Sequence, residues 1–400
     1  MNRRRAKYLL PCCILLCGWA ARPASPVQQS SAPPQDSTAA RFFFGGNAAQ
    51  IPAVFLRNLI FLPARINAGK PFLFELDTAA EKSAAGRNQA GASSGDALPY
   101  AVLTLPGVQI PFVTLPVASP DDFAPQVGQV YQGTLGKDFL DRVIVQVDYV
   151  RETVQLYDPA VFTDSGEGKS FPLTFDGSLP LIRAKFEVSG HKSLQADFVL
   201  DTALDAGILF YREFTDSERI SAAHFKTEAA SYPEVDGGAK LLLGRLKSFQ
   251  IGAYGLEDVV AAFSQQARQN GAGKKVAGAI GSDFLRRFSI VFDFPHQRVI
   301  LTPNSNFNHD ADQDMSGLSI IAKGSNLRVF EVVAVQPDSP GGKAGLQPGD
   351  VIAGVDDEAA ADLSLSAVRD LFRQIGHQYK LLVERKGQTF TVPLQMRRRI

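Results

Sequence analysis

Short apolar runs separated by turn residues dominate the chain from about residue 51 onward. The runs are rich in Val, Ile, Leu and Phe, and Gly, Pro or Asn stands between them. Stretches with a helical period are few, so the pattern predicts a mainly β protein. One helix is expected near the carboxyl end, where apolar residues recur at helical spacing from Leu365 to Phe372. Ser364 is its N-cap candidate and Gly376 is expected to terminate it.

An internal repeat divides the chain into two similar halves. Residues 61–79 (FLPARINAGKPFLFELDTA) resemble residues 179–203 (LPLIRAKFEVSGHKSLQADFVLDTA), and residues 133–159 align with 278–303. Each half runs an apolar strand into Asp-Thr-Ala and later places two hydrophobic residues before a Gly. The copies are offset by 124 residues at the first signature and by 145 at the second. A duplication explains this most economically and predicts two similar β lobes.

The first twenty residues are typical of an export signal. Four basic residues precede an apolar run of 13 residues from Tyr8 to Ala20. A membrane-spanning helix needs roughly 20 such residues, so cleavage is expected, with an uncleaved anchor as the alternative. The signal predicts an exported protein, periplasmic or extracellular. All three cysteines lie inside the signal segment, so the mature chain is expected to have no disulfides. Residues 21–40, rich in Pro, Ser and Gln, predict a disordered linker.

Composition and charge narrow the function classes. The chain is 45% apolar and 20% charged, with a net charge of zero. Removal of residues 1–20 leaves a net charge of about −4, which gives no reason to expect a nucleic-acid partner. The five histidines fall in different segments without metal-ligand spacing, so neither a metal nor another cofactor is expected.

The repeated signatures carry a resemblance to a known family. Asp-Thr-Ala after apolar residues, followed later by Thr134-Leu135-Gly136 in one half and Ala279-Ile280-Gly281 in the other, resembles the retropepsin-like aspartic proteases. The resemblance covers residues 51–305 and implies two β-barrel lobes, at 41–165 and 166–305, that form one pseudo-dimeric site. It implies that Asp77 and Asp201 form the catalytic dyad. Two carboxylates so close together share one proton, which suits them to activate water against a peptide bond.

The same resemblance implies roles for neighbouring residues. Thr78 and Thr202 are expected to form hydrogen bonds across to the opposite lobe. Ala79 and Ala203 replace the family's usual Gly and are expected to bring a backbone N–H toward a carboxylate. The resemblance also implies that Glu81 and Asp205 contact the substrate, with solvated turn acids as the alternative, and that each lobe has a flap, expected at 86–98 and 231–240. Apart from the resemblance, Asp138 and Asp283 each follow a Gly at the expected start of a helix and are expected to be N-caps.

The carboxyl-terminal residues 306–400 resemble a PDZ domain with an α+β fold. Residues 339–360 match its strand-turn core, and residues 364–394 match its closing helix and strands. The resemblance implies that its peptide-binding loop is Gly317-Leu318-Ser319-Ile320, which would capture protein C-termini by adding a strand to the sheet.

Together these patterns predict an exported aspartic-type endopeptidase that hydrolyses peptides or unfolded proteins. Its PDZ domain would recruit substrates or regulate access to the site, and no stable membrane insertion is expected after signal cleavage. A catalytically silent scaffold that binds peptides or proteins is the alternative. A third arrangement, in which each lobe pairs with a lobe of a second molecule, is also open because the signatures are unequally spaced.

Overall fold

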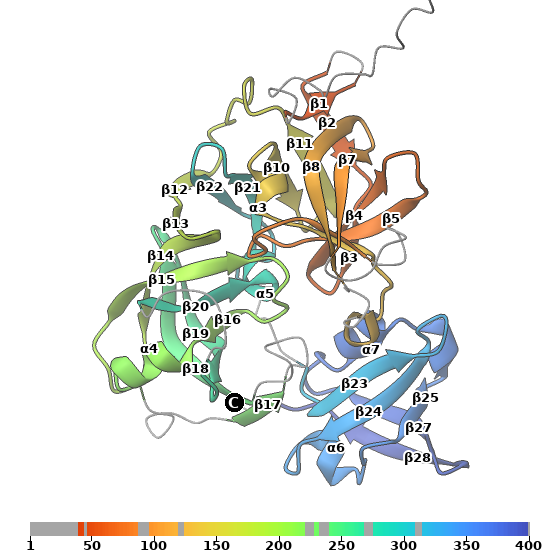
Figure 1. Ribbon diagram of the computed structural model, residues 1–400. Helices are drawn as coiled ribbons and strands as arrows, with labels where there is room; N and C mark the ends of the chain where they lie inside the picture. The colour runs from red at the N-terminus through yellow and green to blue at the C-terminus, as the bar shows by residue number, and fades with distance from the viewer. Residues whose placement is uncertain are drawn as a thin grey trace, which may run out of the picture. The chain divides into compact units, whose positions relative to one another are not determined.

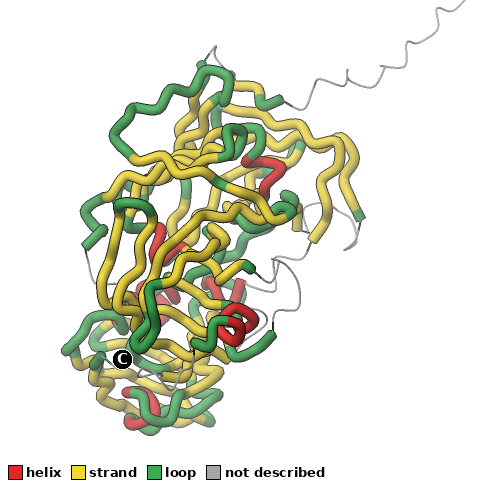
Figure 2. Tube along the Cα trace, turned by 90° about the vertical axis from the view of Figure 1, so that its left-hand side faces the viewer, coloured by secondary structure: helices red, strands yellow, loops and turns green. Residues whose placement is uncertain are grey.

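The computed structural model describes residues 39–43, 46–86, 96–118, 124–220, 228–231, 240–267, 275–308 and 314–398. Strands make up most of the regular structure, and the helices are short (Figure 2). The predicted export signal lies outside these residues, as does the predicted linker apart from its last two residues. No helix within the described ranges combines the length and the apolar character needed to cross a membrane.

Lobe 1 is a closed barrel of six strands in the ring order β4-β5-β9-β6-β8-β7 (Figure 1). The strands are β4 (Leu59–Ile66), β5 (Pro71–Leu76), β6 (Ala84–Gly86), β7 (Ala97–Leu105), β8 (Val108–Ala118) and β9 (Gly133–Leu135). Short strands β1 (Arg41–Phe42) and β3 (Val54–Leu56) extend it, and helices α2 (Ala124–Val127) and α3 (Lys137–Leu140) flank β9 in sequence. The alternating apolar residues of β4, β7 and β8 fill the barrel, as period-2 patterning requires.

Lobe 2 repeats this barrel with the ring order β14-β15-β20-β16-β19-β18. Its strands are β14 (Leu179–Glu187), β15 (Leu194–Asp201), β16 (Ile208–Phe210), β18 (Lys240–Ile251), β19 (Tyr254–Ser264) and β20 (Val276–Gly281). β13 (Thr174–Asp176), β17 (Glu228–Ser231), α4 (Arg212–Ser217) and α5 (Ser282–Leu285) complete the lobe. Each strand takes the place of its counterpart in lobe 1, so the predicted duplication is visible in the topology.

A six-stranded antiparallel sheet joins the lobes in the order β12-β22-β21-β10-β11-β2. Lobe 1 supplies β2 (Ala48–Ile51), β10 (Ile144–Asp148) and β11 (Thr153–Tyr157); the second half supplies β12 (Lys169–Pro172), β21 (Phe288–Asp293) and β22 (Arg298–Pro303). At its centre Gln146 pairs with Val291, its counterpart at the offset of 145. A pseudo-twofold axis therefore passes between β10 and β21, and the two lobes close on each other within one chain.

The carboxyl-terminal domain is a separate sheet with its own apolar core. Its elements are β23 (Leu318–Lys323), β24 (Val329–Val335), α6 (Pro340–Lys343), β25 (Val351–Val355), β26 (Glu358–Ala359), the 3₁₀ turn η3 (Ala360–Asp362), α7 (Leu365–Leu371), β27 (Gln378–Arg385) and β28 (Gln388–Gln395). The sheet order is β23-β24-β25-β27-β28, so β23 lies at an edge. This domain and both lobes belong to one compact unit.

The predicted helix is present, and its N-cap is confirmed. The Ser364 hydroxyl accepts a hydrogen bond of 3.0 Å from the Ala367 N–H, as an N-cap does. The prediction for its end is wrong. The helix ends at Leu371 with Phe372 as C-cap, and Gly376, although its φ is +78°, lies in the turn that leads to β27.

Candidate active site

Both Asp-Thr-Ala segments lie where a central strand ends against a parallel neighbour. Leu76 of β5 pairs with Leu135 of β9, and the Asp77 N–H donates to the Leu135 carbonyl over 3.0 Å. In lobe 2, Asp201 ends β15 and pairs with Gly281 of β20. The strands leading in are buried, so each aspartate emerges from an apolar barrel at its turn.

The threonines lock the two turns together. The Thr78 N–H donates to the Thr202 hydroxyl, and the Thr202 N–H donates to the Thr78 hydroxyl, each over 3.1 Å. Each hydroxyl then donates to a carbonyl of the opposite strand, Thr78 to Leu200 over 2.7 Å and Thr202 to Leu76 over 2.5 Å. Both threonines are fully buried. These are the cross-lobe bonds that the resemblance implied, and they hold the adjacent aspartates to one geometry.

Backbone N–H groups hold one oxygen of each aspartate. Asp77 Oδ1 accepts from Ala79 N–H over 2.8 Å and from the following residue over 3.0 Å. Asp201 Oδ1 accepts from Ala203 N–H and from the following residue, both over 3.0 Å. The alanines that replace the family's Gly therefore keep the N–H in place. In each carboxylate the same oxygen accepts both bonds, which fixes its orientation.

Burial and hydrogen bonding oppose each other at Asp77. Burial raises the pKa of the Asp77 carboxyl, and the N–H bonds from Ala79 and Ala80 lower it by a smaller amount. The net pKa lies above the ordinary value, because removing a carboxylate from water disfavours its charged form. Asp77 is thus suited to carry a proton under conditions in which an exposed aspartate is ionised.

Glu75 is a third carboxyl at this site, and sequence reasoning missed it. It lies two residues before Asp77 on β5, hence on the same face of the strand, and its exposed fraction is 8%. Burial, and to a smaller extent the charges of Asp77 and Asp201, raise the pKa of Glu75 to about 8, against the opposing effect of a hydrogen bond from the Tyr131 hydroxyl. The sequence repeat could have revealed Glu75, because the residue at the same position in the second half, 124 residues later, is the apolar Val199.

The glycines of the second signature pass close to the aspartate turns. A methyl group at Gly136 would lie 2.8 Å from the Ala80 carbonyl oxygen, and one at Gly281 would lie 2.2 Å from that of Ala206. Non-bonded carbon and oxygen atoms do not approach so closely, so only Gly fits where the chain crosses under each turn.

Glu81 and Asp205 occupy unlike surroundings despite their matching positions. Asp205 is 3% exposed and forms an ion pair with Arg57 of lobe 1, and the Asn58 side-chain amide donates to Asp205 Oδ1 over 3.4 Å. Glu81 is exposed and lines a pocket of about 830 Å³. The equal substrate-contact roles expected of them therefore differ: the Asp205 side chain ties the lobes together, whereas Glu81 faces open space.

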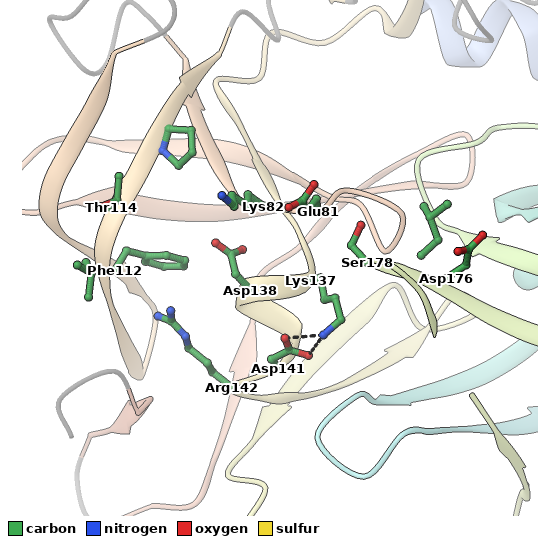
Figure 3. A pocket seen from close by; sticks show the side chains of 14 residues that line it. Glu81, Lys82, Phe112, Thr114, Lys137, Asp138, Asp141, Arg142, Asp176 and Ser178 are labelled. Atoms are coloured by element: carbon green, nitrogen blue, oxygen red, sulfur yellow. Dashed lines mark hydrogen bonds and ion pairs between the residues drawn. The ribbon is translucent and has the colours of Figure 1, made fainter. Parts of the chain in front are cut away.

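The pocket beside Glu81 lies between the lobes at the position related by pseudosymmetry to the Arg57–Asp205 pair. Its wall includes Glu81 and Lys82 of the aspartate turn, α3, β8 and the turn 176–179 of lobe 2 (Figure 3). Gly177 occupies the position that Arg57 has in the other half, so no cation enters from that turn. Across the pocket the Lys137 ammonium pairs with Asp141 over 2.7 Å.

The expectation that Asp138 and Asp283 cap helices is wrong. Gly136 and Gly281 are the N-cap residues of α3 and α5, and neither cap has a side-chain hydrogen bond. Asp138 instead accepts from the Ser83 N–H over 2.7 Å and from its hydroxyl over 2.6 Å. Asp283 pairs with Arg286 over 3.1 Å. Both aspartates lie two residues after the N-cap, so Asp138 binds Ser83 of another loop and Asp283 binds Arg286 at the end of its own helix.

The expected peptide-binding loop lies at the start of the edge strand of the carboxyl-terminal domain. Gly317 adopts a φ of +69°, and Leu318, Ser319 and Ile320 begin β23, with an irregularity in register after Ser319. Both α7 and helix α2 of lobe 1 contact this strand. Of the flap regions, residues 87–95 and 232–239 lie outside the described part. Among the residues described, no cluster of His, Cys, Asp and Glu could hold a metal ion.

Comparison with known proteins identifies the carboxyl-terminal domain. Residues 331–385 match the family model of the PDZ domain, and no curated protein matches the chain. Among solved structures, an aspartic proteinase from Irpex lacteus is 14% identical, with a TM-score of 0.42, over 66% of this chain and 99% of that one. A photosystem II D1 C-terminal processing protease is 32% identical, with a TM-score of 0.20, over 21% of this chain and 23% of that one. The chain thus consists, in its described part, of two closed six-stranded barrels followed by a PDZ domain.

Proposed function

We propose that the chain is an aspartic-type endopeptidase whose site is the Asp77/Asp201 pair. The observation that carries the proposal is the reciprocal hydrogen bonding of Thr78 and Thr202, which joins the two aspartate turns across the lobe boundary. Burial of two threonines does not by itself require reciprocal hydrogen bonds between them. A dyad that shares one proton, in contrast, requires its two carboxylates to be held close together. The raised pKa of Asp77 supports its being the protonated member.

The reaction follows from two carboxyl groups that share one proton. The ionised Asp201 accepts a proton from a water molecule as that water attacks the peptide carbonyl carbon, and Asp77 donates its proton to the carbonyl oxygen. The resulting tetrahedral diol collapses when a proton passes from Asp201 to the amine nitrogen and the C–N bond breaks. Asp77 then recovers its proton from the remaining hydroxyl, which returns the dyad to its starting state.

Peptides and unfolded proteins are the proposed substrates. A peptide-bond hydrolase of this kind needs no cofactor, and the PDZ domain supports recognition of protein C-termini. The basic and apolar amino-terminal pattern supports export to the periplasm or the extracellular space. Export predicts a mature protein that begins after Ala20, and amino-terminal sequencing of the protein from its native compartment checks this.

Cleavage assays with single substitutions test the dyad. The purified protein is incubated with an unfolded protein and a randomised peptide library between about pH 4 and pH 8, and products are identified by mass spectrometry. Asp77→Asn and Asp201→Asn should each abolish cleavage, because each variant lacks one carboxyl of the pair. Asp216→Asn on the surface of α4, where the side chain is 69% exposed, is the matched control and should cleave normally.

Two results would reject this mechanism. Cleavage that survives either dyad substitution shows that the pair does not act as a unit. A folded protein that cleaves nothing across the pH range instead favours the alternative of a silent protease-like scaffold that binds peptides. Circular dichroism of each variant separates loss of chemistry from loss of fold.

A further inference from the structure

The groove of the PDZ domain is in contact with lobe 1. A PDZ groove lies between an edge strand and the neighbouring helix, which are here β23 and α7. Helix α2 of lobe 1 lies against β23, and a methyl group at Gly128, just after α2, would come 2.7 Å from the Leu365 Cβ of α7. The segment 124–128 therefore occupies the space in which an added peptide strand would run.

One arginine joins the two sides of this contact. Arg369 of α7 donates to the Ile320 carbonyl of β23 over 2.8 Å and to the Gln126 carbonyl of α2 over 2.9 Å. Arg369 is only 7% exposed, so both bonds lie in a desolvated setting where their loss is costly. The Ile320 carbonyl on the edge strand is thus already occupied by a side chain that also holds lobe 1.

A short path leads from the docked segment to the dyad. Val127 of α2 packs in one apolar cluster with Tyr131 and Phe61, whose rings are 5.2 Å apart. The Tyr131 hydroxyl donates to Glu75, the buried carboxyl next to Asp77. Displacement of α2 would therefore move Tyr131 and with it the hydrogen-bond donor of Glu75, a carboxyl group that interacts with both proposed catalytic aspartates.

A second path leads from α7 to the turn after Asp201. The Arg57 N–H donates to the Ser366 hydroxyl over 3.2 Å, while the Arg57 side chain pairs with Asp205. Arg373, just after α7, lies 3.6 Å from Asp283 of lobe 2. One face of the PDZ helix thus contacts both lobes close to the residues that follow the catalytic turns.

We infer that the PDZ groove is an intramolecular docking site for the segment 124–128, and that this docking braces the catalytic site. A protein C-terminus that enters the groove must displace the segment, and in doing so it lowers the cleavage rate. The direction follows from the structure, because the threonine lock and the Glu75–Tyr131 bond are formed in the docked state. The catalytic half of the inference rests on the proposed function, whereas the docking half does not.

Gly128→Ala tests the docking from the lobe side, without altering the groove. The added methyl group meets Leu365, and Gly128 has a φ of +77°. Gly166→Ala is the matched control, because Gly166 has the same φ of +77° and nothing within 4 Å of the added methyl group. Three quantities are measured on the full chain: amide hydrogen exchange, binding of short peptides with randomised, free C-termini, and cleavage rate.

Gly128→Ala should speed amide exchange in β23, strengthen peptide binding and slow cleavage, each about tenfold, which is an ordinary coupling between linked sites. Gly166→Ala should change none of these three quantities. Equal exchange in β23 for the two variants overturns the docking. Equal peptide binding, or no binding by either, overturns the competition, and faster exchange with unchanged cleavage overturns the brace.

Two further comparisons keep the outcomes separate. If no form of the protein cleaves, the proposed function fails, while exchange and peptide binding still decide the docking. If Gly128→Ala does not fold, Ser366→Ala replaces it, since that change removes only the acceptor of the Arg57 N–H. It should shift exchange and cleavage in the same directions by a smaller factor, and an absence of any shift counts against the inference.

Discussion

Substitution of Glu75 by Gln should make the stability of the protein less dependent on pH. Glu75 keeps its proton in the folded state up to a pKa of about 8, against a reference value of 4.5 in the unfolded chain. Between these values the unfolded state releases a proton that the folded state retains, so the free energy of unfolding falls as pH rises. Below about pH 4.5 both states are protonated and this cost is absent.

The magnitude follows from the pKa difference. Each pKa unit corresponds to about 1.4 kcal/mol, so Glu75 should cost on the order of 5 kcal/mol of stability between about pH 4.5 and pH 8. Gln has nearly the same shape, accepts the Tyr131 hydrogen bond through its carbonyl oxygen and does not titrate. The difference in unfolding free energy between Glu75→Gln and the unaltered protein should therefore grow in favour of the variant across this range.

Urea unfolding at about pH 4.5, 6 and 8, followed by circular dichroism, measures this difference. Fluorescence of tryptophan is unsuitable, because the one tryptophan, Trp19, lies in the predicted export signal. Glu358→Gln, at an exposed position on β26, is the matched control and should parallel the unaltered protein. Titrating groups that do not interact with residue 75 contribute equally to both proteins and cancel. Parallel curves for Glu75→Gln and the unaltered protein would refute the argument that Glu75 is neutral when folded.

Three other predictions concern the lock, the crossing glycine and a buried acid. Thr202→Val should lower the unfolding free energy by about 1–3 kcal/mol and reduce cleavage, because the buried Thr78 N–H loses its acceptor. Urea titration measures the stability and the cleavage assay the activity. Unchanged stability would contradict a stabilising role for the threonine hydrogen bonds. Gly281→Ala should prevent folding of lobe 2, since the added methyl group would lie 2.2 Å from a carbonyl oxygen. Gly255→Ala is the control and should fold, because no atom lies closer than 3.8 Å to its methyl group. Equal melting temperatures of the two variants would contradict this prediction. Burial raises the pKa of Asp283, but the neighbouring arginines lower it by more, so the ionised side chain stabilises the fold at neutral pH and this stabilisation is lost as pH falls through the folded pKa. Asp283→Asn should therefore be less stable than the unaltered protein near pH 7 and lose less stability on acidification. Thermal melts near pH 7 and at acidic pH measure this difference.

Local pattern was sufficient for the parts of this protein that depend on nearby residues. Short apolar runs between turn residues predicted the strands, the helical spacing after Ser364 predicted α7, and the repeat predicted two similar lobes. That the lobes are barrels was implied by the family resemblance. The roles expected for Thr78 and Thr202 came from resemblance, and the structure shows the hydrogen bonds. Catalysis by Asp77 and Asp201 stays a prediction, although both turns are brought together as it requires.

Residues without a local signal took their roles from distant partners. Asp138 and Asp283 followed a Gly at a helix start, which suggested caps, yet Asp138 binds Ser83 and Asp283 lies 3.6 Å from Arg373, both far away in the sequence. Glu81 and Asp205 occupy equal positions in the repeat, but only Asp205 meets an arginine, because the turn that faces Glu81 contains Gly177 instead of an Arg57 equivalent.

The sequence by itself determined that this chain is mainly β and duplicated, because apolar runs, turn residues and repeated signatures are properties of neighbouring residues. The PDZ domain was recognised from its resemblance to a known family. Only the tertiary structure decided that Glu75 is buried close to Asp77 and Asp201, with a raised pKa, and that helix α2 contacts β23 of the PDZ domain. The physical reason is that burial, electrostatic coupling and domain contacts arise between residues far apart in the chain, and their strength depends on distances that no linear pattern contains.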